Sequence, residues 1–152
     1  MKKDELRSAV EALVPELQGI DLSAADAAAQ IEARLPFASE QVQEIGRLFE
    51  AADVEGELMT GKAGSLRYGR LAKDLGGFSV DAVWMDGPGP LHKHPGGEID
   101  LCFRSEGEGR FDGQEPGWTV YGPDSQHVPT VRNGAMRILY FLPGGLIEFL
   151  GG

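Results

Sequence analysis

The sequence of 152 residues contains one cysteine and three histidines, and it lacks any long apolar run. A single cysteine, Cys102, excludes an internal disulfide, which is typical of proteins kept in a reducing compartment. No stretch approaches the roughly 18 apolar residues that a transmembrane helix needs, and the charged N-terminal stretch MKKDELRSAVEALVPEL lacks the core of a signal peptide. These absences predict a cytoplasmic protein with no membrane partner.

Positive charge is also scarce. The chain has 14 lysines and arginines against 24 aspartates and glutamates, which gives a formal net charge of −10. Such a surface repels the phosphate backbone of nucleic acids, so we expect no nucleic-acid partner. An anionic small molecule would need arginines gathered inside a pocket.

The pattern of apolar residues changes near residues 56–64, from helical spacing to short runs typical of strands. Over residues 1–58 the apolar spacing predicts a helical segment, with helices over about 4–18, over 23–35 with Ser23 as its N-cap, and after a further cap at Ser39. This segment contains no histidine or cysteine. We interpret it as a packing or dimerisation element.

Residues 59–152 consist of short runs rich in β-branched and aromatic residues, separated by turn residues. The runs are SLRYGRL, FSVDAVWM, EIDLCFR, GWTVYG and MRILYFL, and the chain as a whole has 22 glycines and 9 prolines. Short strands joined by tight turns are typical of antiparallel sandwiches and barrels. The sequence therefore predicts a mainly β fold over residues 59–152, preceded by the helical segment.

All three histidines belong to one pattern. His92 and His94 are two residues apart, so on a strand both side chains leave the same face. The Pro95-Gly96-Gly97 turn then directs Glu98 back toward them, and His127 follows a later turn. These residues form a suitable ligand set for a divalent transition metal, and Fe, Mn, Zn, Ni and Co all fit it. The alternative is an exposed hairpin with ordinary polar residues.

The spacing His92-x-His94-x3-Glu98, followed by a turn and His127, resembles the two motifs of the cupin superfamily. The resemblance implies a double-stranded β-helix (a jelly-roll barrel) that holds the metal inside. It also implies a homodimer, because cupins frequently dimerise.

A more specific similarity covers most of the chain. The helical first third followed by WMDGPGPLHKHPGGEIDLCF, PGWTVYGPDSQHVPTV and ILYFLPGGLIEF resembles the 4-hydroxylaminobenzoate lyases of bacterial nitroaromatic degradation. The resemblance implies a lyase that converts 4-hydroxylaminobenzoate, or a similar aryl hydroxylamine, to protocatechuate with release of ammonia. It therefore implies a small aromatic carboxylate as the partner of the pocket.

Two alternatives have the same fold. One is another metal-dependent cupin enzyme, an aromatic-ring dioxygenase or an isomerase. The other is a regulatory module, since some anti-sigma factors join a helical domain to a cupin-like one. Their helical domain carries its own zinc ligands, whereas residues 1–60 here have none, which disfavours the regulator.

Strand alternation extends the site beyond Glu98. If Glu98 faces the barrel interior, Asp100 and Cys102 share its face, while Ile99, Leu101 and Phe103 face the other way. Glu98 and Asp100 are thus the candidate catalytic carboxyl groups, with Asp100 as a general acid or base. The substrate-binding candidates are Arg67, Tyr68, Trp84, Cys102, Arg104 and Tyr140. The substrate carboxylate favours an arginine, and Arg67, Arg70, Arg104 and Arg137 all remain open.

Overall fold

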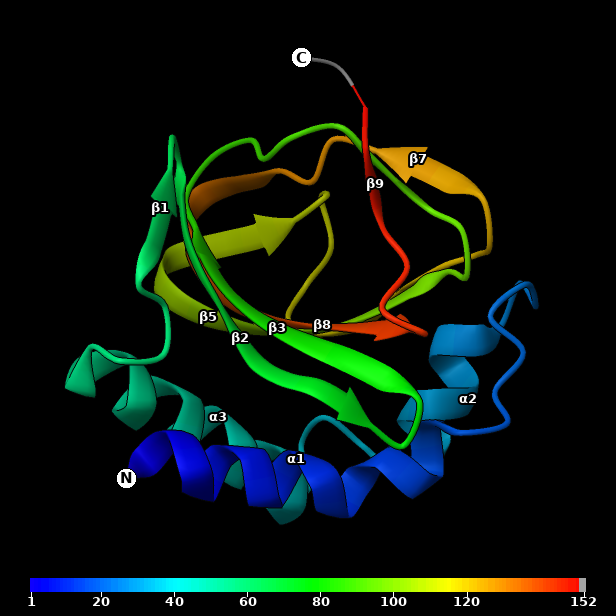
Figure 1. Cartoon of the computed structure of the whole chain (residues 1–152), viewed down its shortest axis with the longest axis horizontal. Coiled ribbons are helices and arrows are strands. Elements are labelled where there is room, and N and C mark those ends of the chain that lie inside the picture. Colours follow the sequence, from blue (N-terminus) through cyan, green and yellow to red (C-terminus); the bar gives the residue numbers. More distant parts are fainter. Residues whose placement is uncertain (151–152) are drawn as a thin grey trace.

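The computed structural model describes residues 1–150 as three helices followed by nine strands (Figure 1). The helices are α1 (Lys2–Leu17), α2 (Ala27–Arg34) and α3 (Glu40–Glu55). The strands are β1 (Gly61–Ala63), β2 (Leu66–Leu75), β3 (Phe78–Met85), β4 (His92–His94), β5 (Glu98–Phe111), β6 (Gly117–Tyr121), β7 (Ser125–His127), β8 (Val131–Pro143) and β9 (Glu148–Phe149). Within residues 1–150, no helix combines the length and the apolar character needed to cross a bilayer.

The three predicted helices are present, and one begins later than expected. α3 begins at the predicted cap, where the Ser39 hydroxyl accepts a hydrogen bond from the Val42 amide at 3.3 Å. Ser23 does not cap α2, because its hydroxyl donates to Asp21 Oδ1 at 2.6 Å in the preceding turn. α2 instead starts at Ala27, after Asp26.

The strands form two antiparallel sheets that face each other. The larger sheet has the order β1-β2-β3-β8-β5-β6, and the smaller has the order β7-β4-β9. The five runs predicted as strands correspond to β2, β3, β5, β6 and β8. The predicted mainly β fold with an N-terminal helical segment is confirmed, and the two sheets enclose the interior of a barrel, as the cupin resemblance implies.

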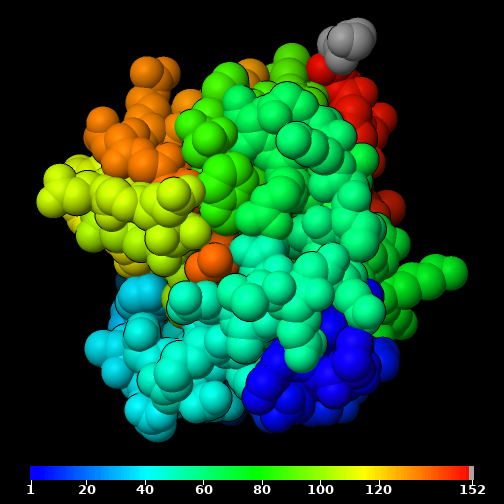
Figure 2. All heavy atoms as spheres, turned by 90° about the vertical axis from the view of Figure 1, so that its left-hand side faces the viewer, coloured from blue at the N-terminus to red at the C-terminus, as the bar shows by residue number. Residues whose placement is uncertain are grey.

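The helices cover the outer face of the six-stranded sheet, and the three-stranded sheet lies on the opposite side (Figure 1). In the view of Figure 2 the helical residues, blue and cyan, form a layer below the strands. Leu6, Val10 and Leu13 recur at helical spacing in α1 and are fully buried in that contact. This face of the sheet therefore closes the hydrophobic core that the helices share.

Residues on β5 alternate between two apolar clusters. Ile99, Leu101 and Phe103 belong to the cluster that contains the helices, whereas Cys102 belongs to a second cluster inside the barrel. The predicted alternation is confirmed, and the partner of the outward face is the helical segment. The inward face is left to build a site.

Candidate metal centre

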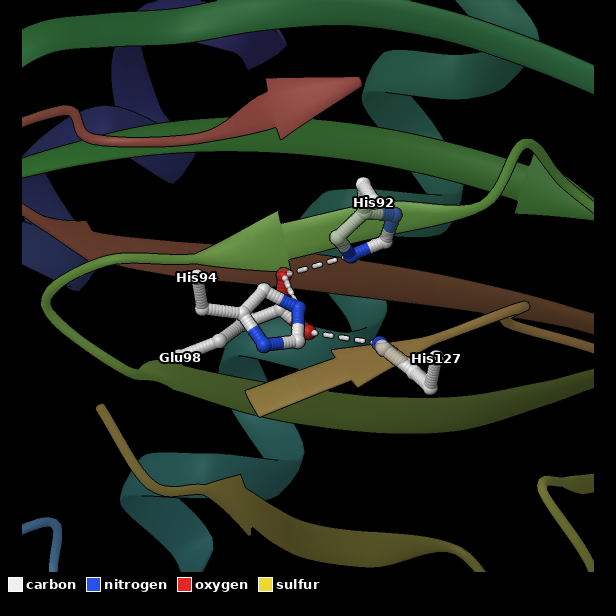
Figure 3. A group of neighbouring side chains, drawn as sticks. All are labelled: His92, His94, Glu98 and His127. Atoms are coloured by element: carbon white, nitrogen blue, oxygen red, sulfur yellow. Dashed lines mark ion pairs between the residues drawn. The ribbon is translucent and has the colours of Figure 1, made fainter. Parts of the chain in front are cut away.

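Four side chains from three strands converge inside the barrel (Figure 3). His92 and His94 lie on β4, His127 lies on β7, and Glu98 opens β5. Glu98 Oε1 lies 3.4 Å from His92 Nε2 and 3.2 Å from His94 Nε2, and its Oε2 lies 3.6 Å from His127 Nε2. One ligand atom from each residue lies within 4.8 Å of the others. The structure thus brings together all four predicted ligands.

The local sequence explains this convergence. β4 pairs with β7 so that His92 is directly opposite His127. The turn after β4 is closed by the Gly97 amide, which donates to the His94 carbonyl at 3.1 Å. Gly97 has φ of 90°, a left-handed conformation that a side chain would strain. The turn reverses the chain within three residues and places Glu98 beneath the two imidazoles.

Each imidazole is held through its Nδ1 atom. His92 Nδ1 lies 3.2 Å from the Pro90 carbonyl, which can only accept a hydrogen bond. His127 Nδ1 lies 2.9 Å from Asp112 Oδ2, a carboxylate acceptor. His94 Nδ1 lies 2.9 Å from Ser125 Oγ, which donates its own proton to the Gly122 carbonyl at 2.6 Å. All three networks place the proton on Nδ1 and leave the Nε2 lone pair directed at the centre.

The converging atoms have no hydrogen-bond partner within the described residues. They are both Glu98 oxygens and the Nε2 atoms of His92, His94 and His127, and each is buried. Buried polar atoms without partners are costly, and here they include three imidazole lone pairs and a carboxylate. This donor set fits a divalent transition metal with three nitrogen ligands and one oxygen ligand.

The electrostatics of the cluster separate its two carboxyl groups. Burial raises the pKa of Glu98, but the Nε2 atoms of the three imidazoles, acting as hydrogen-bond donors when no metal is bound, outweigh burial and hold its pKa well below the usual range. Burial and the charge of Glu98 together raise the pKa of Asp100 well above its usual range. Asp100 is fully buried, and neither of its oxygens has a hydrogen-bond partner among the described residues. Two neighbouring carboxyl groups of opposite protonation state are suited to moving protons.

The cluster opens onto a cavity of ≈ 840 Å³. His92 and Glu98 form part of its wall, and the rest comes mainly from β1 to β3, the loop before β4, and the C-terminal residues. Apolar side chains predominate, among them Leu66, Val83 and Met85. An apolar cavity with a few polar groups on its wall is the usual form of a small-molecule site.

Two of the predicted substrate-binding residues line this cavity. Tyr68 and Tyr140 lie on its wall, on β2 and β8. Cys102 faces the barrel interior and packs in the same cluster as Tyr140 and Val83. Burial raises the pKa of the Cys102 thiol well above its usual range, so Cys102 acts there as a small apolar group.

Three other predicted residues lie elsewhere. Arg67 donates to both oxygens of Asp53 on α3, at 2.6 and 3.2 Å, and stacks over Trp84 with its guanidinium carbon 4.9 Å from the ring. Both residues occupy the helix-facing side of the sheet, because they alternate with Tyr68 and Val83. Arg104 donates to the Gly109 carbonyl at 3.0 Å and to Glu115 at 2.8 Å. The structure does not bring these three residues to the cavity wall.

The residues that hold His127 were not predicted from the sequence. Asp112 accepts from His127 Nδ1, from the Tyr121 hydroxyl, and from the Thr130 amide at 2.8 Å. The Tyr121 ring also stacks on the His127 ring, with centroids 4.1 Å apart. Asp112 has φ of 51°, which is uncommon for a residue with a side chain. No sequence motif links Asp112 to His127, because the two residues meet only through the pairing of strands that are distant in the sequence.

Comparison with known proteins identifies the family. The family described as "PnbB: 4-hydroxylaminobenzoate lyase" matches residues 9–149. The chain belongs to the 4-hydroxylaminobenzoate lyase family. The match includes residues 9–58 of the helical segment as well as every residue of the candidate metal centre, so the family resemblance expected from the sequence is confirmed.

Two curated relatives carry the name of this family. A 4-hydroxylaminobenzoate lyase of Pseudomonas putida is 38% identical over 88 residues, which covers 47% of this chain and 50% of the relative. A second 4-hydroxylaminobenzoate lyase, from Nocardioides sp. (strain LMS-CY), is 36% identical over 94 residues, which covers 55% of this chain and 56% of the relative. The chain thus spans about half the length of the curated relatives it matches.

Among solved structures, this chain is similar to an RmlC-like cupin protein from Ralstonia eutropha JMP134. That structure has 12% sequence identity and a TM-score of 0.46, and the match covers 62% of this chain and 66% of the other.

Proposed function

We propose that this protein is a metal-dependent lyase that converts 4-hydroxylaminobenzoate, or a similar aryl hydroxylamine, to protocatechuate and ammonia. The observation that carries the proposal is the position of His92, His94, Glu98 and His127, whose ligand atoms lie within 4.8 Å of one another beside the apolar cavity. Family membership supports the choice of reaction.

The proposed reaction is balanced without an external oxidant. The N–O bond of the hydroxylamine breaks and a C–O bond forms at the neighbouring ring carbon. A second C–O bond forms at the carbon that carries nitrogen, the C–N bond breaks, and the nitrogen leaves as ammonia. One water is consumed for each ammonia released, and no net electrons are exchanged. The reaction therefore differs from a ring dioxygenation, which consumes molecular oxygen.

The metal centre would promote cleavage of the N–O bond, and the cavity would bind the aromatic ring. The three imidazoles and Glu98 would hold a divalent metal ion, which would act as a Lewis acid toward the departing oxygen of the hydroxylamine. The apolar walls formed by Leu66, Val83 and Met85 would hold the aromatic ring and exclude water from it. The metal is Fe, Mn, Zn, Ni or Co in this proposal, because the donor set fits each of them.

Asp100 is the proposed proton-holding group. It lies on β5 two residues after Glu98. Its cross-strand partner is Tyr140 on β8, which lines the cavity. A protonated Asp100 beside an ionised Glu98 would deliver a proton to a leaving group and take one back as the ring becomes aromatic again. Replacement of Asp100 by Asn is expected to slow turnover while metal is still bound.

The direct test is to load the purified protein with each candidate metal and incubate it with 4-hydroxylaminobenzoate under anaerobic conditions. We expect ammonia and protocatechuate in equal amounts. Failure to form either product with any of the five metals would refute the proposal, and a strict requirement for oxygen would favour the dioxygenase alternative.

Two properties complete the proposal. The protein acts as a homodimer in the cytoplasm, as expected from the sequence. Size-exclusion chromatography with light scattering tests the first property, and cell fractionation tests the second.

A further inference from the structure

The cavity is chemically asymmetric. Its metal-ligand end presents His92 and Glu98, whereas Arg70 lies on β2 at another part of the wall. Among the lining residues that the structure describes, Arg70 is the only lysine or arginine. Its side chain is 52% exposed, which places the guanidinium at the open side of the cavity. An anionic ligand that enters this cavity therefore meets one permanent positive charge, which lies beside the carboxylate of Asp81 on the same wall.

Four other arginines near the barrel pair with carboxylates away from the cavity. Asp53 accepts hydrogen bonds from both Arg67 and Arg137, and Arg137 Nε lies 2.9 Å from Asp53 Oδ2. Glu115 binds Arg104 at 2.8 Å and Arg110 at 2.7 Å. Arg67, Arg104 and Arg110 use terminal nitrogens in these pairs, whereas Arg137 pairs through Nε, as Arg70 does with Asp81. None of the four arginines lines the cavity. The structure thus separates Arg70 from residues that the sequence alone treats alike.

Arg70 is held in a way that leaves its planar fork available. Its cross-strand partner is Asp81, and Arg70 Nε donates to Asp81 Oδ1 at 3.0 Å. Within residues 1–150 the guanidinium makes this one hydrogen bond, which does not use the terminal amino groups. Asp81 therefore orients the group, while the two terminal nitrogens remain for a ligand. Two parallel N–H···O bonds from such a fork match the geometry of a carboxylate.

Arg70 and Asp100 lie in one row of cross-strand partners. Asp81 pairs with Tyr140 on β8, and Tyr140 pairs with Asp100 on β5. Arg70 is thus three strands away from Asp100, about 14 Å along the curved sheet at the usual strand spacing. A flat ring with polar groups at opposite ends, as in a para-substituted benzoate, would lie across this interval with its faces against apolar walls.

We propose that Arg70 is the specificity-determining residue that binds the ring carboxylate of the substrate at the cavity mouth, with Asp81 as its positioning residue. This assignment rests on the proposed function of the metal centre, because Arg70 would select which aryl hydroxylamines reach that centre. Arg70 selects para-carboxylated rings over neutral rings of the same shape.

The test uses a matched pair of unreactive ligands, 4-hydroxybenzoate and 4-hydroxybenzamide. Their binding to the metal-loaded protein is measured by calorimetry for the wild type, Arg70→Gln, Arg70→Lys and the control Arg104→Gln. We expect Arg70→Gln to weaken 4-hydroxybenzoate binding by roughly 10- to 100-fold and to leave the amide within about twofold. Arg70→Lys should recover part of the loss, because it keeps the charge without the fork. Arg104→Gln should bind both ligands as the wild type does.

Retention of the preference for the carboxylate by Arg70→Gln would overturn the assignment, and so would a wild type that binds neither ligand. Thermal unfolding of Arg70→Gln verifies that the variant is folded, and Arg70→Lys gives an independent measurement.

The failures of the two proposals are distinguishable. If Arg70 governs carboxylate binding but the wild type forms no ammonia from 4-hydroxylaminobenzoate, only the proposed reaction fails. If ammonia forms and KM for 4-hydroxylaminobenzoate is unchanged in Arg70→Gln, only the Arg70 assignment fails.

Discussion

The two faces of the six-stranded sheet are built from alternate residues of the same strands, and they differ in what they stabilise. The outer face contributes Ile99, Leu101 and Phe141 to the core beneath the helices. The inner face presents Glu98, Asp100 and Tyr140, and it buries two carboxyl groups whose oxygens have no hydrogen-bond partner among residues 1–150. Burial of apolar side chains on the outer face contributes most of the folding free energy. Burial of the polar groups on the inner face lowers the stability of the folded protein.

The contrast shows how one strand serves both purposes. Alternation requires only that polar residues occupy every second position of β5, and the inward carboxyl groups are tolerated because the outward residues seal the sheet against α1 and α3. The faces should therefore respond differently to substitution.

The largest effect is expected from the inner face. Replacement of His92 by Ala removes one of the three imidazole ligands, so bound metal should fall to background and the proposed lyase activity with it. The far-UV circular dichroism spectrum should not change. The matched control is Lys93→Ala, which lies between the two histidines on β4 with a side chain that pairs with Asp124 outside the site. Elemental analysis that finds equal metal in the two variants would contradict the proposed centre.

The outer face is tested by Phe141, which is fully buried and packs edge-on against Phe78. Phe141→Ala should lower the free energy of unfolding by about 3–5 kcal/mol because it leaves a cavity in the shared core. Its neighbour Tyr140 faces the cavity, so Tyr140→Phe should cost less than about 1 kcal/mol. Denaturant unfolding of both variants measures the difference, and similar losses would show that the faces do not divide as described.

A smaller effect is expected at Asp112, which holds His127 from behind. Asp112→Asn removes the carboxylate that fixes the Nδ1 proton, so metal affinity should fall by about 10- to 100-fold. Glu115→Gln is the control, because Glu115 binds arginines away from the centre. Competition with a chelator of known affinity measures both. Unchanged affinity in Asp112→Asn would mean that ring orientation is set by packing alone.

The smallest effect concerns Asp53, which links α3 to the outer face through Arg67 and Arg137. Burial raises the pKa of Asp53, but these two arginines outweigh it and lower the pKa below the usual range. Asp53→Asn should therefore cost about 2 kcal/mol of unfolding free energy near neutral pH.

The pH dependence of this loss has a definite sign. A lowered pKa in the folded protein means that the stabilisation is complete above the unfolded pKa of about 4 and declines as the pH falls through the folded value. The difference between wild type and Asp53→Asn should thus be constant above about pH 5 and shrink in acid. Glu40→Gln, in an exposed ion pair, should show no measurable change. A difference that grows in acid would contradict this account.

Much of the candidate metal centre could be predicted from the sequence because its determinants are local. His92, His94 and Glu98 lie within seven residues, and a tight turn fixes their relation. Alternation along β5 then predicted correctly that Asp100 and Cys102 face inward.

The arginines could not be assigned from the sequence, because their environments depend on distant pairings. Arg67 and Arg70 are three residues apart on β2 and so face opposite sides. Which side is the cavity depends on where α3 places Asp53 and on the register that sets Asp81 opposite Arg70. The contact between Asp112 and His127 depends on strand pairing in the same way. The start of α2 was mispredicted because a local hydrogen bond between Ser23 and Asp21 competed with capping.

The core that the helices share with the sheet has a thermodynamic consequence for the whole chain. Leu13 of α1 and Ile99 of β5 belong to one continuous cluster, so the helices and the barrel should unfold in a single cooperative transition. A ligand that binds only the folded state stabilises every residue in such a unit. Saturating metal should therefore slow amide hydrogen exchange in α1, on the far side of the sheet from the imidazoles, wherever exchange requires global opening.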